Sequence, residues 1–208
     1  YFYKISTFYP GGTLTWTAAY MTQFFFHPAL GMAFMLAAWG VVMLLTCRLF
    51  RLRGMWQGIA LLVPLALMAC LVQTGYWLYY MKLQGHAWVP TLGVFFALVL
   101  AMPVRRITNR WGRLAWMATV GILGYPLMGA WSFLALALMV LASSNRPWKE
   151  NLWEGALALL LIGLVPTIMV QRFYGQVQWD TAWVAAMPCF QYGKTDCPEY
   201  RYAYYAIG

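Results

Sequence analysis

The chain has 208 residues, of which 63% are hydrophobic and 9% are charged, and its mean hydropathy is +0.63. Soluble globular domains carry about a quarter charged residues, so this composition excludes a water-soluble domain and predicts an all-α, polytopic transmembrane helix bundle. The formal charge of +9 does not indicate nucleic-acid binding, because the Lys and Arg occur in short groups between apolar runs instead of on one solvated face.

The N-terminal residues 1–26 are rich in Tyr, Phe and Trp and contain the sequence YPGGT, whose paired glycines predict a turn. Aromatic side chains gather at headgroup depth, because their rings are apolar and their N–H or O–H groups prefer water. We therefore interpret this region as an interfacial belt, and a platform for a lipid or glycan is the alternative. The sequence starts at Tyr1 without an initiator Met, so we expect a segment of a longer protein that continues at both ends.

Six apolar stretches form the predicted transmembrane domain, residues 1–172. A helix crosses the hydrocarbon core with about 20 mostly apolar residues. The predicted helical spans are 28–46, 56–80, 88–104, 114–124, 130–144 and 152–171. Pro28 suits the first turn of its span, where its missing N–H costs nothing. Pro64, inside the second span, predicts a kink.

Nine basic residues lie between these spans and predict their orientation. They are Arg48, Arg51, Arg53, Arg105, Arg106, Arg110, Arg113, Arg146 and Lys149. Short loops rich in Lys and Arg stay on the cytoplasmic side of a bacterial inner membrane. Residues 1–26, the loop 82–88 and the tail 173–208 are then extracytoplasmic.

The charge-free run 114–144 is predicted to turn back on itself. As a single helix its 31 residues would be about 46 Å long. A core of about 30 Å does not accommodate that length without strong tilt, and Arg146 would lie on the wrong side. The residues expected to form the turn are Gly124, Tyr125, Pro126 and Gly129. Gly accepts left-handed backbone angles, and Pro disfavours helix at the residue before it. We favour this hairpin of two short legs over one continuous kinked helix.

Two of the four cysteines are candidates for a disulfide. Cys189 and Cys197 fall in the predicted extracytoplasmic tail, across a Gly-Lys-Thr-Asp turn, and disulfides persist in oxidising compartments. Cys47 and Cys70 lie in or beside spans, where a cysteine behaves as a small apolar residue. No CxxC motif and no nearby His accompanies the tail cysteines, so we expect no metal site, and no motif indicates a cofactor.

Candidate catalytic groups are few, namely His27, His86 and Asp180. Both histidines are predicted near the outer interface, where they could meet at a cavity mouth, and His transfers protons near neutral pH. Asp180 is the acid closest to the outer end of the last span and could act as a base. For each of the three, the alternative is an ordinary polar side chain at headgroup depth. No ionisable residue lies near a predicted midplane, which disfavours an ion-driven transporter.

The segment YPGGTLTWTAAYMTQFFFHPALG, with the span and Arg-rich loop that follow it, resembles an uncharacterised family of polytopic inner-membrane proteins of Bacteroidota. The resemblance covers about residues 8–175. In its alternating spans and aromatic-rich outer face, the chain is more distantly similar to membrane glycosyltransferases that use lipid-linked sugar donors. This second similarity implies an envelope-biogenesis enzyme that acts on lipid-linked substrates at the outer face.

Two functions therefore remain open. We favour an integral inner-membrane subunit that anchors or scaffolds a larger cell-envelope assembly, with the lipid bilayer and other membrane-protein subunits as its partners. The alternative is the enzyme that the glycosyltransferase similarity implies. Those enzymes carry an acid in an early outer loop, whereas this sequence has no acid before Glu150. The subunit requires no missing residue.

Overall fold

The computed structural model describes residues 9–81, 87–143, 147–174, 182–183 and 185–186, and every regular element in these ranges is helical. The short helices are α2 (Gly12–Met21), η1 (Thr22–Phe26), η2 (Gly54–Trp56) and α4 (Gln57–Ala60). The longer ones are α3 (Pro28–Phe50), α5 (Leu62–Met81), α6 (Val89–Arg106), α7 (Arg110–Met128), α8 (Trp131–Ala142) and α9 (Trp148–Arg172). The prediction of an all-α helical bundle is confirmed.

Four segments of the described residues are long and apolar enough to cross a membrane. They are Pro28–Phe50, Gly54–Leu71, Val89–Arg106 and Glu150–Arg172. The helix α8 is apolar but shorter, with 12 residues. The first two segments are mostly exposed on the bundle surface, because only 22% and 17% of their most apolar windows are buried. Surfaces of this composition favour contact with lipid over contact with water.

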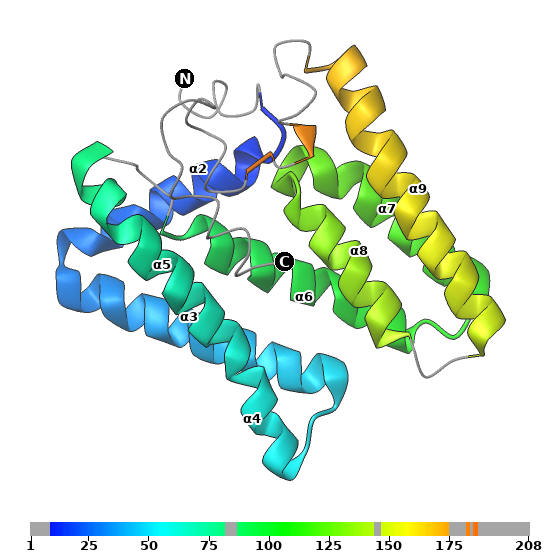
Figure 1. The fold of residues 1–208 in the computed structure, drawn as a ribbon, viewed down its shortest axis with the longest axis horizontal. Helices are drawn as coiled ribbons and strands as arrows, with labels where there is room; N and C mark the ends of the chain where they lie inside the picture. The colour runs from blue at the N-terminus through cyan, green and yellow to red at the C-terminus, as the bar shows by residue number, and fades with distance from the viewer. Residues whose placement is uncertain (1–8, 82–86, 144–146, 175–181, 184, 187–208) are drawn as a thin grey trace.

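The helix α6 lies in the middle of the bundle, between α3 and α5 on one side and α7, α8 and α9 on the other (Figure 1). Small residues of α6, including Ala97 and Ala101, are fully buried where it packs against its neighbours, and small residues let membrane helices approach closely. Hydrogen bonds also join α6 to its neighbours. Trp39 Nε1 donates to Thr91 Oγ1 at 3.1 Å, and Trp116 Nε1 donates to the Leu100 carbonyl at 3.0 Å.

One end of the bundle collects most of the described charges, and we call it the basic end. Arg48 and Arg105 lie in the last turns of α3 and α6. Arg113, near the start of α7, pairs with Glu150 at the start of α9. At the opposite end, the turn before α2 lies beside the turn between α7 and α8, because the Gly11 N–H donates to the Pro126 carbonyl. The ends of α7 and α9 that carry these ion pairs are therefore together, and the chain between them runs out and returns.

The chain turns back between α7 and α8, and this turn is shorter than the one predicted from the sequence. We expected Gly124, Tyr125 and Pro126 to form it, and this was wrong, because α7 continues as a helix through all three. The bend is at Gly129, which ends α7 with φ 63°. A proline inside a membrane helix is tolerated where neighbouring groups compensate for its missing N–H. Here the packing of the residues around Pro126 keeps the helix intact.

The predicted kink at Pro64 takes the form of a helix restart. A turn at Leu61 separates α4 from α5, which begins at Leu62. Pro64 therefore falls in the first turn of α5, where a backbone N–H has no intrahelical partner in any case.

Candidate functional site

The described residues include only some of the predicted site residues. His86, Arg146, Asp180, Cys189 and Cys197 lie outside the described residues, and Lys149 is described only as part of the α9 backbone. The disulfide and the role of Asp180 thus remain predictions. His27 precedes α3, is exposed, and among the described residues its side chain contacts only the ring of Phe26. The predicted meeting of His27 with His86 stays a prediction, because His86 is not among the described residues.

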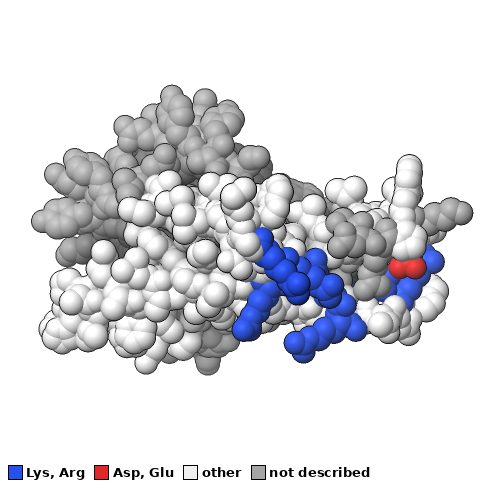
Figure 2. All heavy atoms as spheres, turned by 90° about the horizontal axis from the view of Figure 1, so that it is seen from below, with Lys and Arg blue, Asp and Glu red and all other residues white. Residues whose placement is uncertain are grey.

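Most of the predicted topology-setting arginines are exposed or half-exposed at the basic end, and Figure 2 shows basic side chains gathered there in a dense patch. Arg113 is different, because it lies inside α7 and its side chain is 1% exposed. We expected it to be a loop residue, and the helix instead begins three residues earlier, at Arg110, with the side chain of Asn109 accepting a hydrogen bond from the Trp111 N–H.

Arg113 is the centre of a buried ionic cluster. Its Nε donates to Glu154 Oε1 at 2.7 Å, its Nη2 donates to Glu150 Oε2 at 2.5 Å, and its Nη1 donates to the Thr108 carbonyl at 2.9 Å. The Glu154 side chain is 1% exposed and that of Glu150 is 34% exposed. These bonds hold the starts of α7 and α9 together. The cluster is therefore a connection between the two helices, made through one oxygen of each carboxylate.

Three chain segments meet at the opposite end of the bundle, and we call this contact the junction. The first is the PGG turn before α2, whose Gly11 N–H donates to the Pro126 carbonyl at 3.0 Å. The second is the turn between α7 and α8. The third is the short stretch that contains Ala182 and Ala185, and Ala185 accepts a hydrogen bond from the Ala130 N–H at 2.9 Å. Trp131 Nε1 adds a longer bond to the Ala186 carbonyl, at 3.3 Å.

Two glycines make the junction possible. Gly11 has φ 79°, and a Cβ there would lie 2.4 Å from the Ala186 Cβ. Gly129 has φ 63°, and a Cβ there would lie 2.3 Å from the Ala185 carbonyl oxygen. Positive φ and such close backbone approach both favour glycine. The sequence indicated that Gly11 and Gly129 form turns, but it contained no signal that these turns touch each other.

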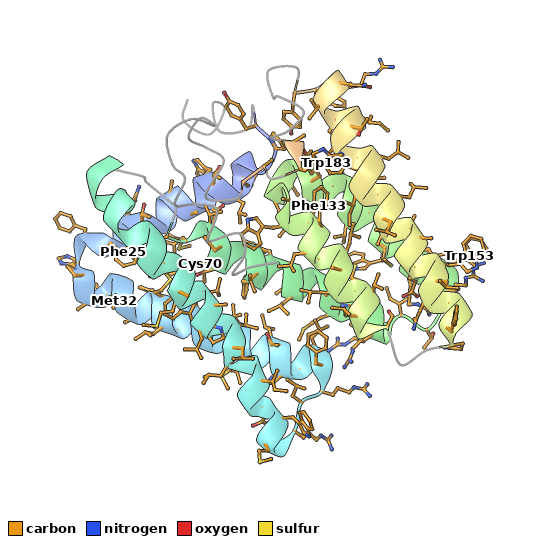
Figure 3. The ribbon with its side chains drawn as sticks, viewed as in Figure 1. Phe25, Met32, Cys70, Phe133, Trp153 and Trp183 are labelled. Carbon is orange, nitrogen blue, oxygen red and sulfur yellow. The ribbon has the colours of Figure 1, made fainter. Side chains whose placement is uncertain are left out.

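Tyr125 of α7 is bonded to the third segment of the junction. Its ring is fully buried and stacks on Phe133 at 5.7 Å between centroids, and its hydroxyl donates to the Ala182 carbonyl at 2.7 Å. Figure 3 labels Phe133 on α8 and Trp183 in the adjacent short segment. Tyr174 follows α9 close to Tyr125, and burial raises the pKa of the Tyr174 phenol above its ordinary value.

A separate feature is a groove of about 320 Å³ among α3, α5, α6 and α8. All of its lining residues except Thr46 are apolar. They are Thr46, Phe50, Leu62, Val63, Ala66, Leu67, Cys70, Pro90, Val94, Leu98, Trp131, Leu134 and Leu138. Cys70, labelled in Figure 3, comes from α5. The groove arises because α5 packs on α3 and stands away from α6 and α8. Its volume is within the range of small-molecule sites.

Within the described residues, no group of His, Cys, Asp and Glu side chains has the arrangement of a metal site. The only carboxylates there are those bound to Arg113. The polar hydroxyls inside the helices mostly bond to carbonyls of their own helix, as Thr46 does to Val42. The two features of the described residues that could serve a function are thus the junction and the apolar groove.

The helical bundle, its apolar exterior and its spans define a polytopic membrane protein. Within that class, the chain belongs to the family of unknown function DUF6057, whose model matches residues 1–207. No curated protein and no solved structure matches the chain.

Proposed function

We propose that this chain is an integral subunit of the bacterial inner membrane that anchors or scaffolds a larger cell-envelope assembly. Its partners would be the lipid bilayer and other membrane-protein subunits. The single observation that carries the proposal is the junction, in which segments from the two ends of the described chain are bonded to the same helical turn. The tail 173–208 would be extracytoplasmic, on the side opposite the basic loops.

The junction has the properties that an anchoring point requires. Its hydrogen bonds join residues far apart in sequence, such as Tyr125 and Ala182, and they are buried. Its glycines leave no room for a shift of one segment past another, since a single added Cβ would overlap Ala185 or Ala186. The chain entering at Gly11 and the chain leaving at Ala186 therefore depart from one fixed place on the bundle.

The polar groups of the described residues agree with a structural role. Arg113 forms ion pairs with both Glu150 and Glu154 at the basic end, and Tyr125 donates a hydrogen bond to backbone. A helical subunit that holds other segments needs such internal connections and no reactive group. The enzyme alternative depends on Asp180, outside the described residues, and no described contact favours it.

The proposal can be tested by opening the junction. Gly129→Ala places a side chain at φ 63° and 2.3 Å from the Ala185 oxygen, a conformation that costs about 1–3 kcal/mol for a residue other than glycine. Gly58→Ala is the matched control, since a Cβ at Gly58 would contact nothing within 4 Å. Membranes of the native host would be extracted in a mild detergent and the native mass of the tagged chain measured.

We expect the parent and Gly58→Ala to migrate in a complex well above the mass of one chain with its micelle, and Gly129→Ala to lose that complex while staying helical and membrane-inserted. Cross-linking in intact membranes before extraction would identify the other subunits and their stoichiometry. A parent protein that is monomeric both after extraction and after cross-linking would refute the scaffold role. So would a Gly129→Ala complex equal to that of the parent.

A further inference from the structure

We propose that the groove among α3, α5, α6 and α8 holds an acyl chain of an anionic phospholipid, and that Arg105 binds the phosphate of the same lipid at the basic end. This inference goes beyond the scaffold role and does not depend on it. Three observations carry it: the composition of the groove, the position of Arg105 relative to it, and the absence of an acidic partner for Arg105 among the described residues.

The groove suits a hydrocarbon chain. Its lining residues are apolar apart from Thr46, and the Thr46 hydroxyl is already bonded to the Val42 carbonyl of its own helix. It runs along α6 from Pro90 to Leu98, which is about 12 Å at 1.5 Å per residue. Of the helices that border it, α3, α6 and the first part of α5 belong to candidate membrane spans, and α8 is a shorter apolar helix, so lipid is the solvent expected around the groove. A membrane lipid reaches the groove without crossing water.

Arg105 continues the groove toward the basic end. It follows Leu98 by seven residues on α6, so the two lie on nearly the same face of the helix, two turns apart. On α3, Phe50 lines the groove and is followed directly by Arg51, whose positive charge acts on Arg105. Two guanidinium groups therefore lie beyond the end of the groove where Phe50 and Leu62 are found.

Nothing in the described residues neutralises this pair of charges. Both described acids, Glu150 and Glu154, bond to Arg113. The Nη1 atom of Arg105 is buried and has no hydrogen-bond partner. Figure 2 shows the acids beside a separate, smaller basic group and away from the dense basic patch. An unpaired, buried donor on a guanidinium favours an anion with several oxygens, and phosphate meets that need with bidentate geometry.

An anionic phospholipid combines both requirements in one molecule. Basic pockets between membrane helices on the positively charged side bind the headgroups of such lipids. A lipid without a phosphate would fill the groove but leave the Arg105 donor unsatisfied, and inorganic phosphate would satisfy Arg105 but leave the groove empty. In a zwitterionic phospholipid the headgroup cation offsets the phosphate charge, so the positive pair Arg51 and Arg105 favours a phospholipid with net negative charge. The proposal therefore commits to a phospholipid whose headgroup as a whole carries net negative charge, with phosphatidylglycerol as the probe.

The test is lipid retention by the purified chain in detergent, measured by native mass spectrometry. Phosphatidylglycerol and phosphatidylcholine with identical acyl chains would be titrated separately. We expect phosphatidylglycerol to bind at least tenfold more tightly than phosphatidylcholine. Arg105→Gln should weaken phosphatidylglycerol binding about five- to tenfold, as expected for one basic contact, and weaken phosphatidylcholine binding less, so that the preference for phosphatidylglycerol falls. Arg172→Gln, the same change at an exposed residue of the opposite end, should have no effect.

A second pair of variants tests the groove without altering charge. Ala66 lines the groove, and Ala66→Trp should fill it and abolish retention of both lipids. Ala69→Trp, on the same helix but outside the lining, should retain them. If Arg105→Gln does not fold, Arg105→Lys keeps the charge without the planar fork and should give an intermediate affinity. Equal affinity for the two lipids, equal effects of Arg105→Gln and Arg172→Gln, or unchanged retention in Ala66→Trp would each overturn the proposal.

Discussion

Replacing Arg113 by Met should destabilise the bundle by about 3–5 kcal/mol, because the change leaves a buried carboxylate without its partner. The Glu154 side chain is 1% exposed, its Oε1 would lose the 2.7 Å bond from Arg113, and its Oε2 already has no hydrogen-bond partner. Glu150 is 34% exposed, so water can replace much of its bond to Arg113, and we assign it a small share of the loss. The Thr108 carbonyl would also lose its donor.

Two further variants separate the charge from the packing. Glu154→Gln keeps an oxygen for the Arg113 Nε and should cost less, about 1.5–3 kcal/mol for one charge-assisted hydrogen bond. The double variant Arg113→Met with Glu154→Leu removes both buried charges and should lie within about 1 kcal/mol of the parent, since well-packed apolar pairs replace buried ion pairs at little cost. Unfolding free energies would be measured by titrating SDS into mixed micelles while following helicity. Glu154→Leu alone would complete the cycle, and simple addition of its cost and that of Arg113→Met in the double variant would contradict a direct pair, as would a loss below about 1 kcal/mol in Arg113→Met.

Three other predictions concern the junction, the tail and the orientation. Tyr125→Phe should increase hydrogen exchange around Ala182 and cost about 1–3 kcal/mol, because the Ala182 carbonyl loses a buried donor at 2.7 Å; unchanged exchange would count against the junction as a stabilising contact. Cys189 and Cys197 should be linked, which mass spectrometry of unreduced peptides would show, and two free thiols would contradict it. Met55→Cys, 96% exposed near the basic end, should resist an impermeant thiol reagent in intact cells but react after permeabilisation, and strong labelling of intact cells would reverse the orientation.

The helical nature of the chain could be predicted because it depends on properties that are local in sequence. Apolar runs long enough to cross the membrane and the absence of charge within them require backbone hydrogen bonds inside each segment. Pro28 at the start of α3 and Gly129 at the end of α7 likewise act through their own backbone angles. At Pro126 the local preference does not decide the structure, because α7 continues through it. Its preference against helix at Tyr125 is outweighed by the buried contacts that Tyr125 makes with Phe133 and Ala182.

The junction and the ionic cluster could not be predicted because their partners are distant in sequence. Arg113 bonds to Glu154, 41 residues away, and Tyr125 bonds to Ala182, 57 residues away. A partial signal existed for the cluster. Glu150 and Glu154 are one helical turn apart, and they are the only acids before residue 180, so a buried arginine was a reasonable partner. The sequence contains no indication of the groove, because the groove results from the distance of α5 from α6 and α8.

Trp131 connects the groove with the junction. Its ring lines the groove, and its Nε1 donates to the Ala186 carbonyl at 3.3 Å. The ring also packs directly against Gly93 of α6, where an added Cβ would lie 2.3 Å from a ring carbon. The indole is rigid, so Gly93→Ala must displace it, at a cost of about 1–3 kcal/mol for overpacking. A displaced ring alters the groove wall and withdraws the hydrogen-bond donor from Ala186 in one movement.

Gly93→Ala should therefore weaken phosphatidylglycerol retention and increase hydrogen exchange at the junction together, although the three atoms nearest to an added Cβ at Gly93 all belong to Trp131. Gly40→Ala on α3 is the control, because a Cβ there meets nothing within 4 Å, and it should change neither measurement. Filling the groove from the other side with Ala66→Trp should affect retention but leave the junction protected, since Ala66 is on α5 and the ring of Trp131 need not move. If Gly93→Ala changes only one of the two properties, Trp131 does not connect them, and lipid in the groove has no direct route by which to influence the segments held at the junction.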